Sequence, residues 1–349
     1  MLRTDLLDKL QVIAPALSSV NLVPVLSHIW FRGNEVMAFN DSIAITTPLQ
    51  TDFKIAVPGK LLLDLLKASR AKNIELRVEN NQIIMQAATA KVRLAMLTEE
   101  AFVFDMPEFT NNAFKVSKEF LAGIKNCMRS VDTDTSIPDQ LGVTLIPTKD
   151  KLYMFSTNNA TISRSVLRDV SNSIKSRVIL SSSFCAQLLS LKEIDKLEIN
   201  ADYALAQAGN TFLFGRTIES PSPLDFASII KDFTLRGYKE QLVAIPSKLQ
   251  LILDRAVIMT EASGIEKKPM QISVRERGRM NFLAESDHGR INDSMQIEEQ
   301  QEEVTITAEP KLIRNGYDAF NEEGAWVVTK FGIIMEKGSD LYLIGVKGD

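Results

Sequence analysis

Residues 58–67, Pro-Gly-Lys-Leu-Leu-Leu-Asp-Leu-Leu-Lys, and the alternating segments after them are the clearest guide to the fold. Proline is common at the start of a helix, and the leucines recur at the three- and four-residue spacing of a helix with one buried face. The segments 74–78, 82–86 and 91–94 then alternate between apolar and polar residues, which is typical of strands. This part of the chain therefore predicts one helix followed by three short antiparallel strands.

The same unit recurs along the chain. Its six copies begin near Thr4, Pro58, Ser117, Ser181, Pro246 and Glu309. Each start has Ser, Thr or Pro at or near it, residue types that favour the first turn of a helix. Strand trios also follow the fourth and sixth helices, at 196–200, 203–208 and 211–215 and at 325–329, 333–336 and 340–346. The copies are spaced by about 60 residues, which indicates an internal repeat.

One helix covers only one face of one sheet, so two units are needed to close a core. Pairing them predicts an α+β protein of three tandem domains, 1–111, 112–232 and 233–349, each made of two copies of a helix plus antiparallel strands. The boundaries fall in the polar stretches 109–112 and 231–234. Three unrelated α+β domains are the alternative, but they leave the near-constant period unexplained.

The composition excludes several classes of protein. With 45% hydrophobic and 24% charged residues among 349, the chain is typical of soluble globular proteins. Its net charge of −4 gives no overall attraction to nucleic acid. Cys127 and Cys185 are too few for a disulfide framework, so we interpret them as reduced core thiols. We expect neither a signal peptide nor a membrane span, and hence a cytoplasmic protein.

Basic residues concentrate in the predicted helices although the whole chain is acidic. In three helices they recur seven residues apart, as Lys60/Lys67, Lys118/Lys125 and Lys248/Arg255. Seven residues make two helical turns, so each pair lies on one face. A single lysine of this kind is ordinarily just part of a solvated surface. The repeated offset indicates helices that face phosphates while the rest of the surface repels them.

No catalytic or metal-binding motif is recognisable in the sequence. Residues 209–217 have two glycines like a phosphate-binding loop, but the spacing is one residue too long and Arg216 replaces the required lysine. Residues 132–136 begin like a calcium loop but lack its glycine and final glutamate. His28 and His288 have no partner ligands nearby in the sequence. We therefore predict a protein that is not an enzyme and has no cofactor or metal.

The unit of about sixty residues, doubled into domains and tripled along the chain, resembles the bacterial sliding clamp, the beta subunit of DNA polymerase III. The best-matching segments are 55–66 with 74–97, 113–124 and 249–259. The resemblance implies a ring of two chains, with helices lining a hole around double-stranded DNA and sheets outside. It implies a homodimer that tethers a DNA polymerase as a replication processivity factor, is opened by a clamp loader, and has no membrane partner.

The resemblance also assigns roles to residues. Non-specific contacts to DNA phosphates would come from Lys60, Lys67, Arg70, Lys118, Lys125, Arg129, Lys248, Arg255, Lys311 and Arg314. The dimer interface would join Val92 and Leu94 of one chain to Ile258 and Met259 of the other. A groove for an extended peptide of the polymerase or loader would be formed by Thr157, Asn159, Ala160, Ile162, Pro223, Ile229, Leu343, Ile344, Gly345 and Val346.

The groove is where the sequence departs most from the family. Bacterial clamps carry Asp-Gly-His-Arg where residues 158–161 read Asn-Asn-Ala-Thr, and they end in Met-Pro-Met-Arg-Leu where residues 345–349 read Gly-Val-Lys-Gly-Asp. Losing both methionines removes flexible apolar lining from the groove. These departures favour a phage-encoded clamp that serves its own polymerase.

Three other interpretations stay open. A clamp-like interaction protein would bind clamp partners without encircling DNA, and it would not respond to charge reversal on the helices. A trimeric ring is disfavoured, because nine domains would make the hole too wide to contact the duplex. An enzyme that uses His28 or Cys127 is the least favoured.

Overall fold

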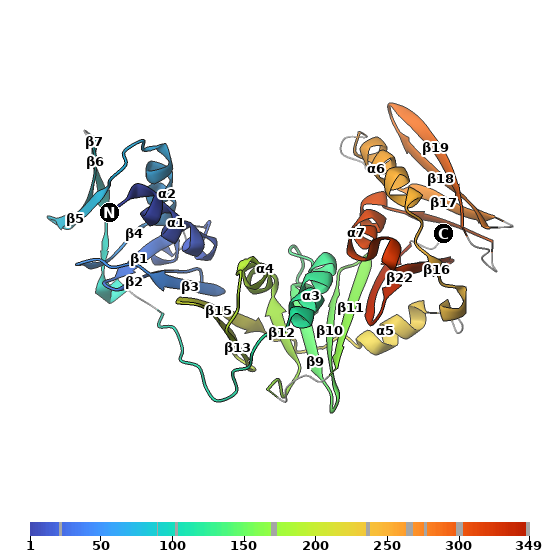
Figure 1. The fold of residues 1–349 in the computed structure, drawn as a ribbon, viewed down its shortest axis with the longest axis horizontal. Coiled ribbons are helices and arrows are strands. Elements are labelled where there is room, and N and C mark those ends of the chain that lie inside the picture. The colour runs from blue at the N-terminus through green and yellow to red at the C-terminus, as the bar shows by residue number, and fades with distance from the viewer. Residues whose placement is uncertain are drawn as a thin grey trace. The chain divides into compact units, whose positions relative to one another are not determined.

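The chain forms two compact units in the computed structural model, which describes residues 1–20, 23–88, 90–101, 104–168, 173–234, 238–262, 268–275, 278–297 and 303–346. The first unit consists of Met1–Ser117 and Ser171–Ile218, and the second of Lys118–Val170 and Glu219–Asp349. Each unit combines helices with antiparallel sheets (Figure 1), which confirms the predicted α+β class. The division into three domains stays a prediction.

In the part of the first unit that the structure describes, the α-helices are α1 (Arg3–Ile13), α2 (Gly59–Ala68) and α4 (Ser182–Ser190). Its larger sheet contains β1 (His28–Arg32), β2 (Glu35–Phe39), β3 (Ile43–Pro48), β4 (Lys54–Pro58), β8 (Leu97–Thr98), β12 (Val178–Ser181), β13 (Lys196–Ile199), β14 (Tyr203–Ala208) and β15 (Thr211–Ile218). A separate sheet contains β5 (Glu75–Glu79), β6 (Gln82–Ala87) and β7 (Ala90–Ala95). All the strand pairs given for this unit are antiparallel, as the alternating sequence segments predict.

Pairing of β15 with β3 unites distant segments in the core of the first unit. Phe214 lies opposite Ala44 and Gly215 opposite Ile43. The ring of Phe184 on α4 packs directly on Gly215, where a Cβ atom would lie only 2.4 Å from that ring. The opposite face of the sheet is covered by the segment after β8, in which Phe104 stacks on Phe39 with ring centres 4.4 Å apart. Both faces of the sheet are therefore buried.

The described residues of the second unit form four α-helices, α3 (Lys118–Cys127), α5 (Phe226–Phe233), α6 (Lys248–Glu261) and α7 (Pro310–Phe320). One sheet runs in the order β16 (Val243–Ala244), β21 (Ala325–Thr329), β22 (Gly332–Lys337), β23 (Asp340–Gly345), β11 (Thr161–Arg168), β10 (Lys151–Thr157) and β9 (Gly142–Pro147). The other runs in the order β19 (Gly289–Gln296), β18 (Arg279–Ser286), β17 (Met270–Arg275) and β20 (Val304–Ala308).

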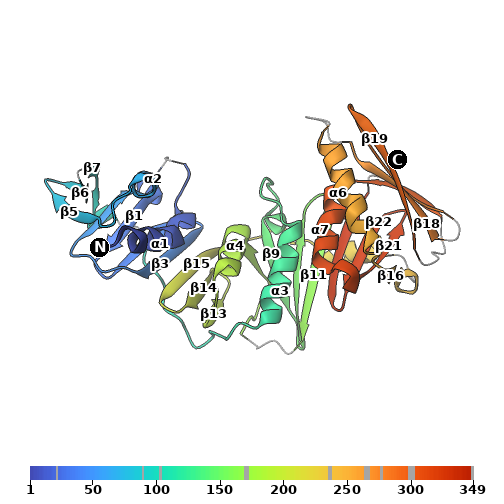
Figure 2. The same ribbon diagram turned by 45° about the horizontal axis from the view of Figure 1, so that its top comes forward.

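Helices cover both faces of the larger sheet of the second unit. Helices α3 and α7 lie side by side on one face, and α5 lies on the other (Figures 1 and 2). Side chains alternate along β23 in agreement with this arrangement. Leu343 packs in the cluster that contains α5, whereas Ile344 packs in the cluster of α6 and α7. The alternation places neighbouring residues in two different cores.

The six predicted helices and the three predicted strand trios are confirmed, with ends shifted by up to four residues. Ser181 caps α4 as predicted, because its hydroxyl accepts the N–H of Phe184 at 3.2 Å. Thr4 does not cap α1, because the helix already begins at Arg3. Helix α5 was not predicted, because residues 231–234 read as a polar boundary. Among the described residues, no helix is long and apolar enough to cross a membrane.

The turn between β21 and β22 depends on Gly332, the first residue of β22. Its φ of +147° disfavours any side chain, and a Cβ would lie 1.9 Å from the carbonyl oxygen of Ile344. We expect Gly332→Ala to lower the free energy of unfolding by about 3 kcal/mol or more. Gly338 is the control, since its φ is +61° but no atom lies within 4 Å of the place its Cβ would take, so Gly338→Ala is expected to cost about 1 kcal/mol. Thermal unfolding followed by circular dichroism compares them, and equal losses would contradict the packing argument.

Candidate functional site

The cations predicted to contact DNA fall into two groups, those without an ion-pair partner in the chain and those whose charge is held by a carboxylate or a backbone carbonyl. Lys60 and Lys67 lie on α2, with Arg70 just beyond its end, and Lys118 and Lys125 lie on α3. These five side chains are exposed, since the apolar residues of both helices face the cores. Among the residues that the structure describes, none of the five forms an ion pair with a carboxylate. Their full positive charge is therefore available to an external anion.

The cations on α6 and α7 are largely compensated. Arg255 pairs with Asp293, and Arg314 pairs with Asp318 and, at 2.8 Å, with Asp254. The Lys311 ammonium lies 3.9 Å from Glu261.

Two further cations of the predicted DNA-contacting group donate to backbone carbonyls. The Lys248 ammonium donates to Ser294 at 2.8 Å, and Arg129 donates to Asn315 of α7 at 3.1 Å. Arg129 thereby joins the end of α3 to α7, which the sequence did not indicate. These residues have structural partners within the chain, unlike the lysines of α2 and α3.

The residues predicted at a dimer interface lie on a strand and a helix. Strand β7, with Val92 and Leu94, pairs only with β6 among the described strands, so its outer edge is open. Leu94 is buried, whereas Val92 is half-buried. On α6, the Ile258 side chain is 71% exposed, the highest value among the large exposed hydrophobic residues. Met259 is partly buried, and its sulfur accepts the Ser286 hydroxyl. Val92 and Ile258 thus present apolar surface that the folded chain leaves uncovered.

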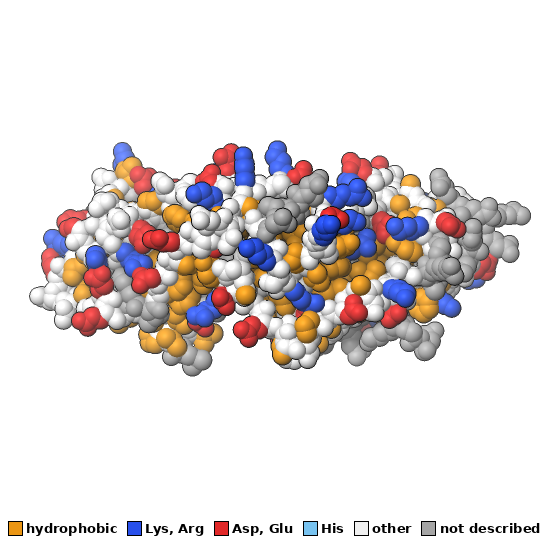
Figure 3. Space-filling model, turned by 90° about the horizontal axis from the view of Figure 1, so that it is seen from below, with side chains coloured by type: hydrophobic (Ala, Val, Ile, Leu, Met, Phe, Trp, Pro, Cys, Tyr) orange, Lys and Arg blue, Asp and Glu red, His pale blue; other side chains and the backbone are white. Residues whose placement is uncertain are grey.

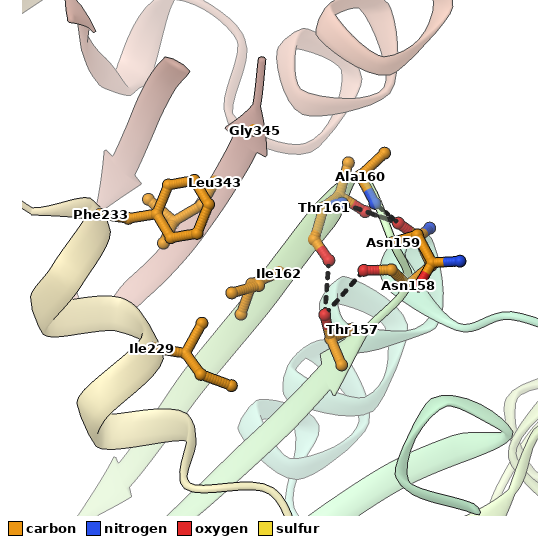
Figure 4. Close-up of a pocket in the computed structure, with 10 residues that line it drawn as sticks. All are labelled: Thr157, Asn158, Asn159, Ala160, Thr161, Ile162, Ile229, Phe233, Leu343 and Gly345. Atoms are coloured by element: carbon orange, nitrogen blue, oxygen red, sulfur yellow. Dashed lines mark hydrogen bonds between the residues drawn. The ribbon is translucent and has the colours of Figure 1, made fainter. Parts of the chain in front are cut away.

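A cavity of about 120 Å³ opens in the second unit, at the turn between β10 and β11. On the face viewed in Figure 3, which is the lower side in Figure 1, hydrophobic side chains lie exposed between charged ones. The cavity is lined by Thr157, Asn158, Asn159, Ala160, Thr161, Ile162, Ile229, Phe233, Leu343 and Gly345. Figure 4 shows two walls, with Ile162, Ile229, Phe233 and Leu343 on one side and the polar turn on the other. Such a shape accommodates an apolar side chain beside a peptide backbone.

The polar wall is held by Asn158. Its side-chain oxygen accepts the N–H of Ala160 at 2.9 Å, the N–H of Thr161 at 2.7 Å and the Thr161 hydroxyl at 3.1 Å. The Ala160 carbonyl in turn accepts the N–H of Gly345 at 2.8 Å. The turn is therefore fixed to the end of β23, which closes this side of the cavity.

Most of the predicted groove residues meet in this cavity. Its lining includes Thr157, Asn159, Ala160, Ile162, Ile229, Leu343 and Gly345. The prediction missed Asn158, Thr161 and Phe233. Phe233 could have been found from the spacing of Phe226, Ile229, Ile230 and Phe233, which is that of an amphipathic helix.

Three predicted groove residues do not line the cavity. Ile344 is buried on the opposite face of β23, because side chains alternate along a strand. Val346 packs against that same opposite core, and Pro223 is exposed ahead of α5. The last residues of the tail, 347–349, lie outside the described residues.

The cysteines and His28, the side chains considered for catalysis, are packed within the fold. Cys127 and Cys185 are buried thiols, and the Cys185 thiol donates to the Leu180 carbonyl at 3.8 Å. Burial lowers the pKa of His28, and its Nδ1 lies 2.5 Å from the Pro24 carbonyl oxygen. Within the described part of the chain, no group of three or more His, Cys, Asp or Glu is placed to hold a metal ion.

Comparison with known proteins identifies the fold. Residues 1–105 match the family model described as "DNA polymerase III beta subunit, N-terminal domain". A putative DNA polymerase III beta subunit from Eubacterium rectale is 16% identical with a TM-score of 0.83, over 99% of this chain and 97% of that chain. The beta subunit from Thermotoga maritima is 16% identical with a TM-score of 0.81, over 99% and 98%.

The DNA polymerase III subunit beta from Pseudomonas aeruginosa is 15% identical with a TM-score of 0.81, over 100% of this chain and 99% of that chain. No curated protein matches the chain in sequence. The resemblance drawn from the sequence is thus confirmed: residues 1–105 match the family model, and the chain has the sliding-clamp fold over essentially its whole length.

Asn158 offers a test of the polar wall. We expect Asn158→Ala to lower the free energy of unfolding by about 1–2 kcal/mol, because three donors lose their shared acceptor. Amide hydrogen exchange at Ala160 and Thr161 should become faster. Asn158→Asp is the control, because a carboxylate keeps the acceptor. Unchanged exchange in the alanine variant would show that the turn is held by other contacts.

Proposed function

We propose that this protein is a DNA sliding clamp, a replication processivity factor that encircles double-stranded DNA and tethers a DNA polymerase. The observation that carries the proposal is the likeness to beta subunits of DNA polymerase III over 99–100% of the chain. A clamp performs no chemistry, which agrees with a sequence that contains no catalytic motif.

The free lysines of α2 and α3 supply the attraction to DNA. Phosphate contacts of this kind do not depend on base sequence and weaken steeply as salt rises, so a ring held by them can slide. Enclosure rather than affinity then keeps the ring on DNA. A polymerase bound to the ring stays at high local concentration near the primer end.

The ring requires a second copy of the chain, and the open edge of β7 is the surface proposed for it. Unpaired backbone groups along an edge strand favour pairing with a strand of another chain. The exposed Ile258 of α6 would be covered at the same contact, together with Val92. A clamp loader would open this contact.

The cavity beside α5 is the proposed peptide groove. Its apolar wall of Ile162, Ile229, Phe233 and Leu343 would bury hydrophobic side chains of a polymerase or loader peptide. The polar turn at Asn158 differs from the family pattern, so the partner peptide would differ as well. This departure supports a phage-encoded clamp that acts with its own polymerase in the cytoplasm.

A clamp-like interaction protein remains the second candidate function. The compensated cations of α6 and α7 favour it, because they reduce the attraction to DNA that an inner wall would exert. Such a protein would occupy clamp partners through the groove without encircling DNA.

Charge reversal on α2 and α3 separates the two functions. We expect the variant with Lys60, Lys67, Lys118 and Lys125 changed to Glu to bind a 30-base-pair duplex at least tenfold more weakly at low salt. The slope of log affinity against log salt should fall by about 0.9 for each lost phosphate contact. Fluorescence anisotropy at several salt concentrations measures both. Reversal of Lys115, Lys149, Lys175 and Lys192, which lie outside the helices, is the matched control. Equal effects in both variants would favour the interaction protein.

Ile258 tests the proposed dimer. We expect Ile258→Asp to give a monomer in size-exclusion chromatography with light scattering while the wild-type chain is a dimer. The substitution should change the Tm little, because the side chain is 71% exposed. Leu251→Asp is the matched control, since Leu251 lies on the same helix and is 59% exposed. A wild-type monomer would refute the ring.

A further inference from the structure

A basic pocket lies on strands β10 and β11 at the end opposite to the groove. It is lined by Lys151, Tyr153, Arg164, Val166, Arg168, Lys239, Gly338 and Ser339. Four of these side chains carry positive charge, and the pocket volume is about 550 Å³. The groove residues lie at the turn that joins the two strands. The same hairpin therefore carries an apolar groove at one end and a basic pocket at the other.

The pocket contains an unfavourable arrangement of charges. Lys151 and Arg168 lie directly opposite each other in the antiparallel register of β10 and β11. Like charges at such positions destabilise a sheet. In the described part of the chain, neither residue, nor Arg164 nor Lys239, forms an ion pair with a carboxylate. An unfavourable pair of like charges that no carboxylate of the chain neutralises is typical of a functional site.

Arg164 points to a ligand by a second observation. Its Nε is buried and has no hydrogen-bond partner among the described residues. Two carboxyl groups lie near it. Glu336 accepts the Tyr238 hydroxyl at 2.6 Å, and burial raises the pKa of Asp340 although the positive charge of Arg164 lowers it. Asp340 thus attracts Arg164 without forming an ion pair with it among the described residues, and the Arg164 Nε is left as a donor without a hydrogen-bond partner there.

Aromatic side chains connect the pocket with the groove. Tyr153 stacks on Phe155 with ring centres 6.0 Å apart, and Phe155 stacks on Phe226 of α5 at 4.8 Å. Along β11, Arg168 in the pocket lies six positions after Ile162 in the groove, which corresponds to about 20 Å of strand. An extended peptide of six or seven residues spans that distance.

We propose that this pocket binds an acidic segment of a protein partner, whose Asp or Glu side chains lie next to the apolar residues that the groove takes. Carboxylates match the four cations in charge, and Arg164 can bind one of them with two hydrogen bonds. The inference rests on the proposed function only for the identity of the partner as a clamp-binding protein. Charge in the pocket would raise the association rate and select partners with acidic flanks.

The test measures direct binding of a fluorescent peptide of ten alternating Asp and Glu residues to the full chain, without DNA. We expect binding at low salt that weakens at least tenfold in the double variant Lys151→Glu with Arg168→Glu. The control reverses Lys149, two residues from Lys151 on the exposed turn before β10, together with Lys175, and should change the affinity less than twofold. Because no DNA is present, failure here is separate from failure of the clamp.

Stability gives an independent readout. The single variant Lys151→Glu places opposite charges across the strands, so its Tm should rise by about 1–2 °C while peptide binding falls. Equal peptide binding by wild type and the double variant would overturn the proposal. The proposal would also be overturned if single-stranded oligo-dT bound more tightly than the peptide and lost affinity in the same double variant. Displacement of the peptide by millimolar inorganic phosphate would overturn it as well.

Discussion

The antiparallel pairing of β11 with β23 holds the second unit together. It places Thr161 opposite Ile344 and Ile162 opposite Leu343, and so joins segments about 180 residues apart in the chain. The alternation of side chains along these strands then separates two cores, one under α5 and one under α6 and α7. The groove exists only because this pairing brings the β10–β11 turn to the end of β23 and to Phe233 of α5.

The distribution of ion pairs gives the helices different electrostatic roles. Arginines on α6 and α7 are held by aspartates of the same unit, whereas the lysines of α2 and α3 are not. Exposed pairs contribute little to stability, but they remove charge that would otherwise attract phosphate. The uncompensated lysines of α2 and α3 are therefore the cations of the predicted set that would attract phosphate most strongly.

The basic pocket shows how a site for a charged partner places strain on a sheet. Lys151 opposite Arg168 reduces the stability of the β10–β11 hairpin, while the buried pairs of Phe155 with Phe226 support it from the face of α5. The hairpin can carry the repulsion because its other face is fixed to α3. On that face, the side-chain amide of Asn126 in α3 donates to the hydroxyl of Ser165 in β11 at 3.0 Å.

Local patterns of residues were sufficient to predict six helices and three trios of strands. Helical spacing of leucines, strand alternation and the cap at Ser181 depend on residues close in the chain, and the structure agrees with them. Helix α5 was not predicted, because Lys231 and Asp232 at its charged end obscured its amphipathic pattern. Folding in three dimensions was needed to show that Ile344 faces away from the groove, that Arg255 is neutralised by Asp293, and that four cations converge on one pocket. Each of these outcomes depends on strand register and on packing between distant segments, which no local pattern specifies.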